Sequence, residues 1–208
     1  MRTIDLNDWK RKEHFEFFSA FKDPVFGIVS EVDCSKAYAF SKENKFSFFA
    51  YYMHRSMLAV DSIEELKYRI FEGKVVVYDE IHAGPTIGRE DGTFGFSFIP
   101  FERDFSKFSK LLSQEVEAVR NSTGLRHNVD GNRKNVIYYS TLPWSTFSGL
   151  KHPSNETDIE GIPKITFGKA FMRDKIMIMP VSIHAHHGLV DGLHIAKYIE
   201  TFQKLLDE

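Results

Sequence analysis

The sequence has little cysteine, no long apolar run and no excess of positive charge. Its single cysteine, Cys34, excludes a disulfide within the chain, so we expect a reducing compartment, the cytoplasm. No stretch approaches the roughly 20 apolar residues that a membrane-spanning helix needs, and the first residues form no signal-peptide core. The formal net charge of −2 argues against nucleic-acid binding. We therefore expect neither a membrane nor a nucleic-acid partner.

Aromatic residues are what the chain has in abundance. Twenty of the 208 residues are phenylalanine, while the shares of hydrophobic residues (42%) and charged residues (27%) are ordinary for a globular protein. So many large rings predict a thick core, an apolar ligand pocket or a buried subunit interface. The length fits one domain over residues 1–208.

The apolar pattern alternates between helical and extended spacing without a regular βαβ order. Helices are expected over residues 9–18 (capped by Asn7 or Asp8), 46–60, 104–120 and from about 191 to 206. Strands are expected over residues 24–32, 69–71, 74–78, 83–88, 93–99, 136–141, 165–171 and 175–185, with a turn at 172–174 and loops at 121–134 and 151–162. The fold class is therefore α+β, a two-layer sandwich of one mixed sheet with helices packed against it.

The segment from His186 to Gly192, His-His-Gly-Leu-Val-Asp-Gly, is the most informative part of the chain. Strand alternation before it puts His187 at the end of an apolar row that includes Ala185, and His186 on the opposite face. Partial burial favours a neutral imidazole, which a general base must be. We predict that His187 is the base and that His186 is structural.

Asp191, four residues after His187, needs a partner if it is buried. A backbone amide, the start of the last helix and a cation are the three alternatives. In each of them the carboxylate orders the site and does not carry the proton.

A second interpretation of the histidines is a metal or ligand site. Imidazole groups bind zinc, and this region holds four histidines: His184, His186, His187 and His194. Zinc sites have a tighter ligand set than this loose cluster, so no metal is expected.

The segment 186–192 is similar to the HHxxxDG signature of coenzyme A-dependent acyltransferases. Four further segments, in order along the chain, resemble the chloramphenicol acetyltransferases over nearly the full length. They are residues 8–17, 76–79, 139–144 and 165–169, the last followed by Met179-Pro180 before the signature.

This resemblance implies a homotrimer of α+β subunits with each active site at a subunit interface. It implies that His187 of one subunit deprotonates a small-molecule alcohol, whose oxygen attacks the thioester of acetyl-CoA, the cosubstrate. Ser140 would donate a hydrogen bond to the oxyanion, and Arg11 would pair with Asp191 as a structural ion pair. Without the resemblance, Ser140 would be interpreted as an ordinary strand residue and Arg11 as a solvated charge on a helix.

The resemblance also assigns residues to the two substrates. Thr166 would lie near the acceptor and act through water, and Trp144 and Lys169 would receive coenzyme A. Phe17 and Phe18 fall where the family builds its chloramphenicol pocket. Phe94 is a further candidate for that pocket, and core packing is the alternative for all three phenylalanines and for Trp144.

The sequence departs from the family mostly in the acceptor pocket. Phe18 stands where the family commonly has a tyrosine, and the segment 149–155 is more polar than its apolar equivalent. Outside that pocket, Ala170 replaces an aromatic residue near coenzyme A. The expected function is a chloramphenicol O-acetyltransferase or a close relative. The alternative is an acyltransferase of the same fold that acts on a different, more polar alcohol or takes a longer acyl donor. The catalytic domain of a dihydrolipoamide acyltransferase fits less well, because no lipoyl domain or Pro/Ala-rich linker is present.

Overall fold

The computed structural model describes residues 1–127, 129, 133–153 and 160–208. Its helices are α1 Lys12–Ser19, α2 Ser35–Glu43, α3 Phe48–Asp61, the 3₁₀ helix η1 Glu64–Lys67, α4 Phe105–Arg120 and α5 Gly192–Leu206. Its strands are β1 Arg2–Thr3, β2 Val25–Asp33, β3 Tyr68–Phe71, β4 Lys74–Val77, β5 His82–Gly88, β6 Phe94–Phe96, β7 Val136–Leu142, β8 Lys164–Gly168, β9 Phe171–Arg173 and β10 Ile176–His186.

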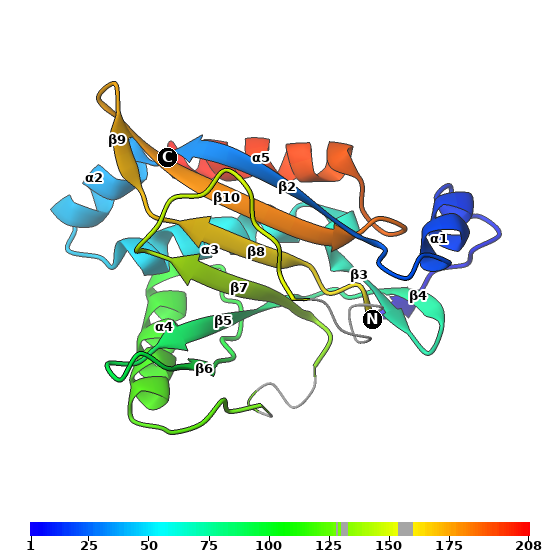
Figure 1. Ribbon diagram of the computed structural model, residues 1–208, viewed down its shortest axis with the longest axis horizontal. Coiled ribbons are helices and arrows are strands. Elements are labelled where there is room, and N and C mark those ends of the chain that lie inside the picture. The colour runs from blue at the N-terminus through cyan, green and yellow to red at the C-terminus, as the bar shows by residue number, and fades with distance from the viewer. Residues whose placement is uncertain (128, 130–132, 154–159) are drawn as a thin grey trace.

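The main sheet is mixed and has the strand order β2-β10-β8-β7-β5-β6, with β9 paired to β10. Strand β10 runs antiparallel to both β2 and β8, whereas β7 runs parallel to β8 and β5. Because β8 and β10 run in opposite directions, their carboxyl ends lie at opposite ends of the sheet (Figure 1). A small second sheet has the order β1-β4-β3. The fold is α+β, as the sequence predicts.

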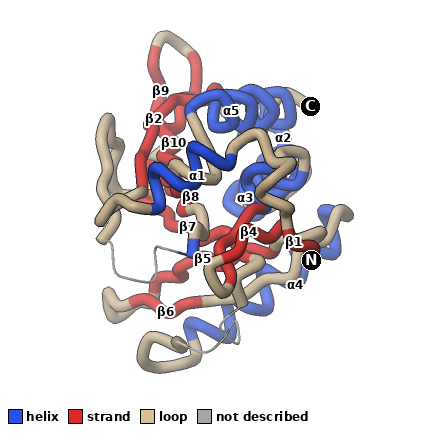
Figure 2. Tube along the Cα trace, turned by 90° about the vertical axis from the view of Figure 1, so that its right-hand side faces the viewer, coloured by secondary structure: helices blue, strands red, loops and turns tan. Residues whose placement is uncertain are grey.

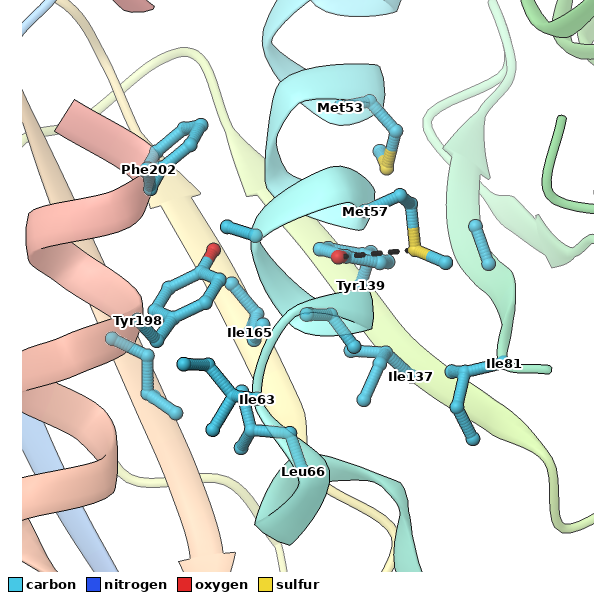
Figure 3. Close-up of a cluster of buried hydrophobic side chains, with 14 of the residues drawn as sticks. Met53, Met57, Ile63, Leu66, Ile81, Ile137, Tyr139, Ile165, Tyr198 and Phe202 are labelled. Atoms are coloured by element: carbon cyan, nitrogen blue, oxygen red, sulfur yellow. Dashed lines mark hydrogen bonds between the residues drawn. The ribbon is translucent and has the colours of Figure 1, made fainter. Parts of the chain in front are cut away.

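Helices α2 to α5 cover one face of the main sheet, and loops cross the other face (Figure 2). The alternation expected for β10 is present, since Met179, Val181, Ile183 and Ala185 are all in the core. Figure 3 shows α3 and α5 packed on β7 and β8 through such buried side chains. The Ser56 hydroxyl contacts the hydroxyls of Tyr139 (2.8 Å) and Tyr198 (2.7 Å), which satisfies polar atoms in an otherwise apolar layer.

Several expectations about elements were wrong. Helix α1 begins at Lys12 with Arg11 at its N-cap, because Trp9 forms a turn with Lys12 and packs its ring on Tyr68 at 5.5 Å. Neither Asn7 nor Asp8 caps that helix. Helix α2 was not expected at all, because it buries only the small side chains of Ala37 and Ser41.

The expected strand over 165–171 is two strands, β8 and β9, which pair with different parts of β10. They separate because the Lys169 N–H donates to the Ser145 carbonyl (2.9 Å) instead of continuing the ladder. The turn that follows lies at Asp174 and Lys175, both with positive φ, and not at 172–174. Parts of the two expected loops, residues 128, 130–132 and 154–159, lie outside the described residues.

Candidate active site

His187 follows directly after β10, in the turn that leads to α5. Its backbone N–H donates to the Pro24 carbonyl (2.9 Å), which ties the turn to the start of β2. Its ring is stacked between two phenylalanines, Phe18 of α1 with a centroid distance of 4.0 Å and Phe26 of β2 at 4.4 Å. Contacts on both faces fix the plane of the imidazole, as a positioned base requires.

The two nitrogens of the His187 ring differ in their surroundings. Nδ1 is buried and has no hydrogen-bond partner among the residues that the structure describes. This leaves Nε2 as the nitrogen that can reach a substrate. A neutral ring with its proton on Nδ1 would present the lone pair of Nε2, which is the acceptor that a base needs.

His186 has a different environment, in agreement with its predicted structural role. Its side chain is 2% exposed, and its Nδ1 accepts a hydrogen bond from the Gly188 N–H (3.1 Å). Burial lowers the pKa of His186 to about 4, and the adjacent His187 adds to this shift. The ring is therefore neutral and already engaged near neutral pH.

The predicted ion pair between Arg11 and Asp191 is present. Arg11 Nη1 donates to Asp191 Oδ2 at 2.6 Å, and Arg11 Nη2 donates to the backbone carbonyl of His187 at 3.1 Å. One guanidinium thus joins α1, the start of α5 and the turn that carries the predicted base. Burial acts to raise the pKa of the Asp191 carboxyl, but the Arg11 hydrogen bond and nearby positive charge hold that pKa below its usual value.

Asp191 is also the N-cap of α5. Its side chain accepts from the Leu193 N–H (3.0 Å), while its own N–H donates to His194 Nδ1 (3.1 Å), which completes a capping box. His194 Nε2 lies 3.4 Å from Glu65 Oε1 of η1. All three partners considered for Asp191, a backbone amide, a helix start and a cation, are therefore combined in one carboxylate.

Ser140 and Thr166 lie side by side on neighbouring strands, on the sheet face away from the helices. Ser140 of β7 pairs with Thr166 of β8, and Thr166 pairs with Ser182 of β10. Thr166 is fully buried, and its Oγ1 lies 2.9 Å from Nε2 of His152. The hydroxyl that was expected to hold a water is thus engaged by an imidazole.

One chain does not bring Ser140 and His187 together. Ser140 is level with Ser182, and His187 lies five residues beyond Ser182, or about 16 Å at the usual rise per strand residue. Trp144 and Lys169 follow β7 and β8, so they lie at the end of the sheet opposite to His187 (Figure 1). Arg11 and Asp191 lie with the predicted base, whereas Ser140 and the two predicted coenzyme residues lie in a separate region of the structure.

Trp144 and Lys169 are on adjacent loops, joined by the Lys169 to Ser145 backbone hydrogen bond. Both are exposed, and Trp144 is 79% exposed, which excludes the core alternative for this ring. Phe17 (61%) and Phe94 (45%) are also exposed, so neither is core. Phe94 lies on β6 at the far edge of the sheet from β2, well away from His187 of the same chain.

Sequence reasoning missed three residues of this region. Phe26, which stacks on His187, has the pattern of an ordinary strand residue, and only the pairing of Phe26 with Ala185 brings it beside the turn. His152 lies in a segment noted for its polarity, but no sequence signal connects it to Thr166. Glu65 contacts His194 through an element, η1, that was not expected.

Metal ligation was the second interpretation of the histidines. Within the described part of the chain, no group of three or more His, Cys, Asp or Glu side chains is arranged to hold a metal ion. We also find in that part no helix with the length and apolar character that a membrane crossing requires.

Comparison with known proteins decides the family. The family model described as chloramphenicol acetyltransferase matches residues 1–203. The chain belongs to the chloramphenicol acetyltransferase family. A chloramphenicol acetyltransferase of Escherichia coli is 26% identical over 207 residues, which cover 99% of this chain and 94% of the relative. A chloramphenicol acetyltransferase of Clostridioides difficile is 28% identical over 208 residues, covering 98% and 94%.

Solved structures agree with this assignment. A structure named chloramphenicol acetyltransferase superposes with a TM-score of 0.92 at 29% identity and covers 99% of both chains. The dihydrolipoamide acetyltransferase of Azotobacter vinelandii gives a TM-score of 0.73 at 15% identity, covering 94% of this chain and 86% of its own, which shows a shared fold alone. As a member of the chloramphenicol acetyltransferase family, the protein is an acyltransferase.

Proposed function

We propose that this acyltransferase transfers the acetyl group of acetyl-CoA to a hydroxyl of a small molecule, in the cytoplasm, as a homotrimer. In this proposal His187 removes the proton of the acceptor hydroxyl through Nε2, and the oxygen attacks the thioester carbonyl. Ser140 donates a hydrogen bond to the oxyanion that forms. When the C–S bond breaks, His187 returns its proton to the departing thiolate.

The observation that carries the proposal is the fixation of His187. Its ring is held by Phe18 and Phe26, and its backbone by Arg11 and Pro24. A base that is already oriented contributes about 10²–10⁴ to the rate, because no freedom is lost when the substrate binds. A structural histidine would instead have its Nδ1 engaged, as His186 does.

The separation of His187 from Ser140 supports an active site between subunits. The two residues are about 16 Å apart along the sheet by strand geometry, too far for one chain to place both on the same carbonyl group. We propose that Ser140, Thr166, Trp144 and Lys169 of one subunit face His187 of its neighbour, with the acceptor and acetyl-CoA between them. A closed ring of three identical contacts would give three such sites.

The first test is acetyl-CoA turnover with chloramphenicol, followed by release of the free thiol. Release that depends on chloramphenicol supports the chloramphenicol O-acetyltransferase activity. Turnover of other alcohols without turnover of chloramphenicol supports the alternative, an O-acyltransferase of the same fold for a more polar acceptor. Absence of transfer to every alcohol tried would contradict both.

The second test mixes two inactive chains. A chain with His187→Ala and a chain with Ser140→Ala are unfolded together, refolded at equal amounts and assayed. If the site lies between subunits, mixed trimers regain one intact site each, and activity returns to about a quarter of wild type. As a control for dilution, a chain with both substitutions is refolded with an equal amount of wild-type chain. Failure to regain activity in mixed trimers would place both residues' roles within one subunit or refute them.

A further inference from the structure

A cavity of about 260 Å³ opens on the sheet face that carries Ser140 and Thr166. It lies between the start of β2, the start of β8 and the loop after β7. Five of its lining residues carry a charge or an imidazole: Asp23, Lys151, His152, Lys164 and His184. Its volume equals that of about eight or nine liquid water molecules, so it admits one ring of a small acceptor and not a whole drug-sized molecule.

His152 connects this cavity to the row of Ser140 and Thr166. The imidazole lines the cavity, and its Nε2 is hydrogen-bonded to Thr166 Oγ1 at 2.9 Å. Thr166 is fully buried, whereas His152 is half-buried. An acceptor that approaches Ser140 from this side therefore meets the imidazole of His152 and not the hydroxyl of Thr166.

His184 holds the segment with His152 against the sheet. Its Nε2 donates to the Leu150 carbonyl (3.1 Å), its Nδ1 is 3.3 Å from the Ser182 hydroxyl, and its ring meets His152 edge-on at 5.0 Å. Gly27 of β2 leaves room for this ring, because a Cβ there would lie 2.5 Å from His184 Nε2. Burial lowers the pKa of His184, so the ring is neutral at neutral pH. These contacts fix the positions of His152 and His184 in the cavity lining.

The lining favours one kind of acceptor. An apolar group would remove water from charged and imidazole groups without replacing their hydrogen bonds, which is unfavourable. The charged groups are of both signs, since an anionic group would meet Asp23 beside the two lysines, and a cationic group would meet Lys151 and Lys164. Neutral hydroxyls both donate and accept hydrogen bonds, so they can pair with every polar group in the cavity lining.

We propose that His152 is the specificity-determining residue of this acyltransferase, and that it selects a neutral polyhydroxylated acceptor, such as a sugar, over an apolar aromatic alcohol. The acceptor's body would occupy the cavity with one hydroxyl directed along the sheet towards Ser140. The inference rests on the proposed function, since the cavity selects an acceptor only if acetyl transfer takes place beside it.

Binding separates this inference from the proposed reaction. The affinities of chloramphenicol and of methyl glucoside are measured by calorimetry for wild type, His152→Leu and His152→Gln, and acetyl transfer to both is measured in parallel. His152→Leu keeps a similar volume and removes the polar nitrogens, whereas His152→Gln keeps a hydrogen-bonding side chain. His14→Leu, an exposed substitution on α1 outside the cavity, is the matched control.

For His152→Leu we expect chloramphenicol to bind at least tenfold more tightly and methyl glucoside at least tenfold more weakly. We expect His152→Gln and His14→Leu to stay within about threefold of wild type for both ligands. If His152→Leu leaves the ratio of the two affinities unchanged, or shifts it towards methyl glucoside, the inference is overturned whether or not turnover is seen. Loss of acetyl transfer in every variant and in wild type would instead refute the proposed reaction, while the affinities still report on His152.

Discussion

Arg11 and His187 are 176 residues apart in the chain, yet the Arg11 guanidinium donates to the His187 carbonyl at 3.1 Å. The same guanidinium binds Asp191 at 2.6 Å, so the turn after β10 is fixed from outside the signature that contains it. The positions of the imidazole and of the carboxylate therefore depend on one arginine of α1.

We expect the substitution Arg11→Ala to lower both stability and activity, because it frees the turn and leaves Asp191 without its cation. A double-mutant cycle with Asp191→Ala should give a coupling of about 1–3 kcal/mol, measured by urea denaturation. The exposed pair of Lys204 and Glu200 (2.7 Å) is the control, and its coupling should be much smaller because water screens it. Additive effects of Arg11→Ala and Asp191→Ala would refute the coupling.

The Arg11 and Asp191 pair also has a pH signature with a definite sign. The folded-state pKa of Asp191 is lowered, so its stabilising contribution is complete above the unfolded value of about 4 and is lost as the pH falls through the lower folded value. Comparing wild type with Asp191→Asn from pH 5 downwards measures this loss. An equal slope in the two proteins would contradict it.

The substitution His187→Ala should reduce kcat by about 10²–10⁴ without unfolding the protein, because the proposed base is lost and the flanking rings remain. Initial rates with saturating acetyl-CoA and a thermal melt measure the two quantities. His14→Ala, which changes an exposed histidine of α1, is expected to behave like wild type. An active His187→Ala protein would end the assignment of the base.

The substitution Ser140→Ala should reduce kcat by about 10²–10³, since the proposed hydrogen-bond donor to the oxyanion is removed. The KM for the acceptor should change little, because the donor acts mainly on the intermediate. Ser106→Ala, at an exposed position of α4, serves as the comparison. A Ser140→Ala protein with raised KM and unchanged kcat would indicate a binding role instead.

His186 predicts how stability depends on pH. In the folded protein its pKa is about 4, whereas an unfolded histidine titrates near 6.5, so between these values the unfolded chain binds the extra proton. The free energy of unfolding should therefore fall by about 3 kcal/mol through this group as the pH drops from about 6.5 to 4. Urea denaturation at several pH values should show that this fall in the free energy of unfolding is smaller by that amount in His186→Asn. The fall should be unchanged in His14→Asn.

Arg69 predicts a large stability effect far from the active site. Its side chain is fully buried and donates to four backbone carbonyls, those of Leu66, Tyr68, Lys134 and Val136. Burial lowers the pKa of this guanidinium to about 9. The substitution Arg69→Met should cost about 3 kcal/mol or more, because buried carbonyls lose their donors. A denaturation midpoint close to that of Arg120→Met, a surface control, would show that these hydrogen bonds contribute little.

The sequence was sufficient to predict an element where its local pattern matches the contacts that the element makes in the fold. Alternation in β10 predicts which residues reach the core, and the spacing after Asp191 predicts α5. It was insufficient where small or polar residues are buried, as in α2, whose Ala37 and Ser41 give no apolar stripe.

The same limit applies to the site. The partnership of Arg11 with Asp191 came from the family resemblance, because no local signal joins two residues at opposite ends of the chain. The stacking of Phe26 on His187 and the contact of His152 with Thr166 depend on strand register and on a loop path, which pattern alone does not determine.

The distance between the turn after β10 and the middle of β7 has a consequence for how the enzyme behaves in solution. If each working site needs two neighbouring chains, specific activity is a function of protein concentration and falls once dilution separates them. A freshly synthesised chain would then be inactive until it meets its copies, and an inactive chain in excess would silence the active ones that it joins.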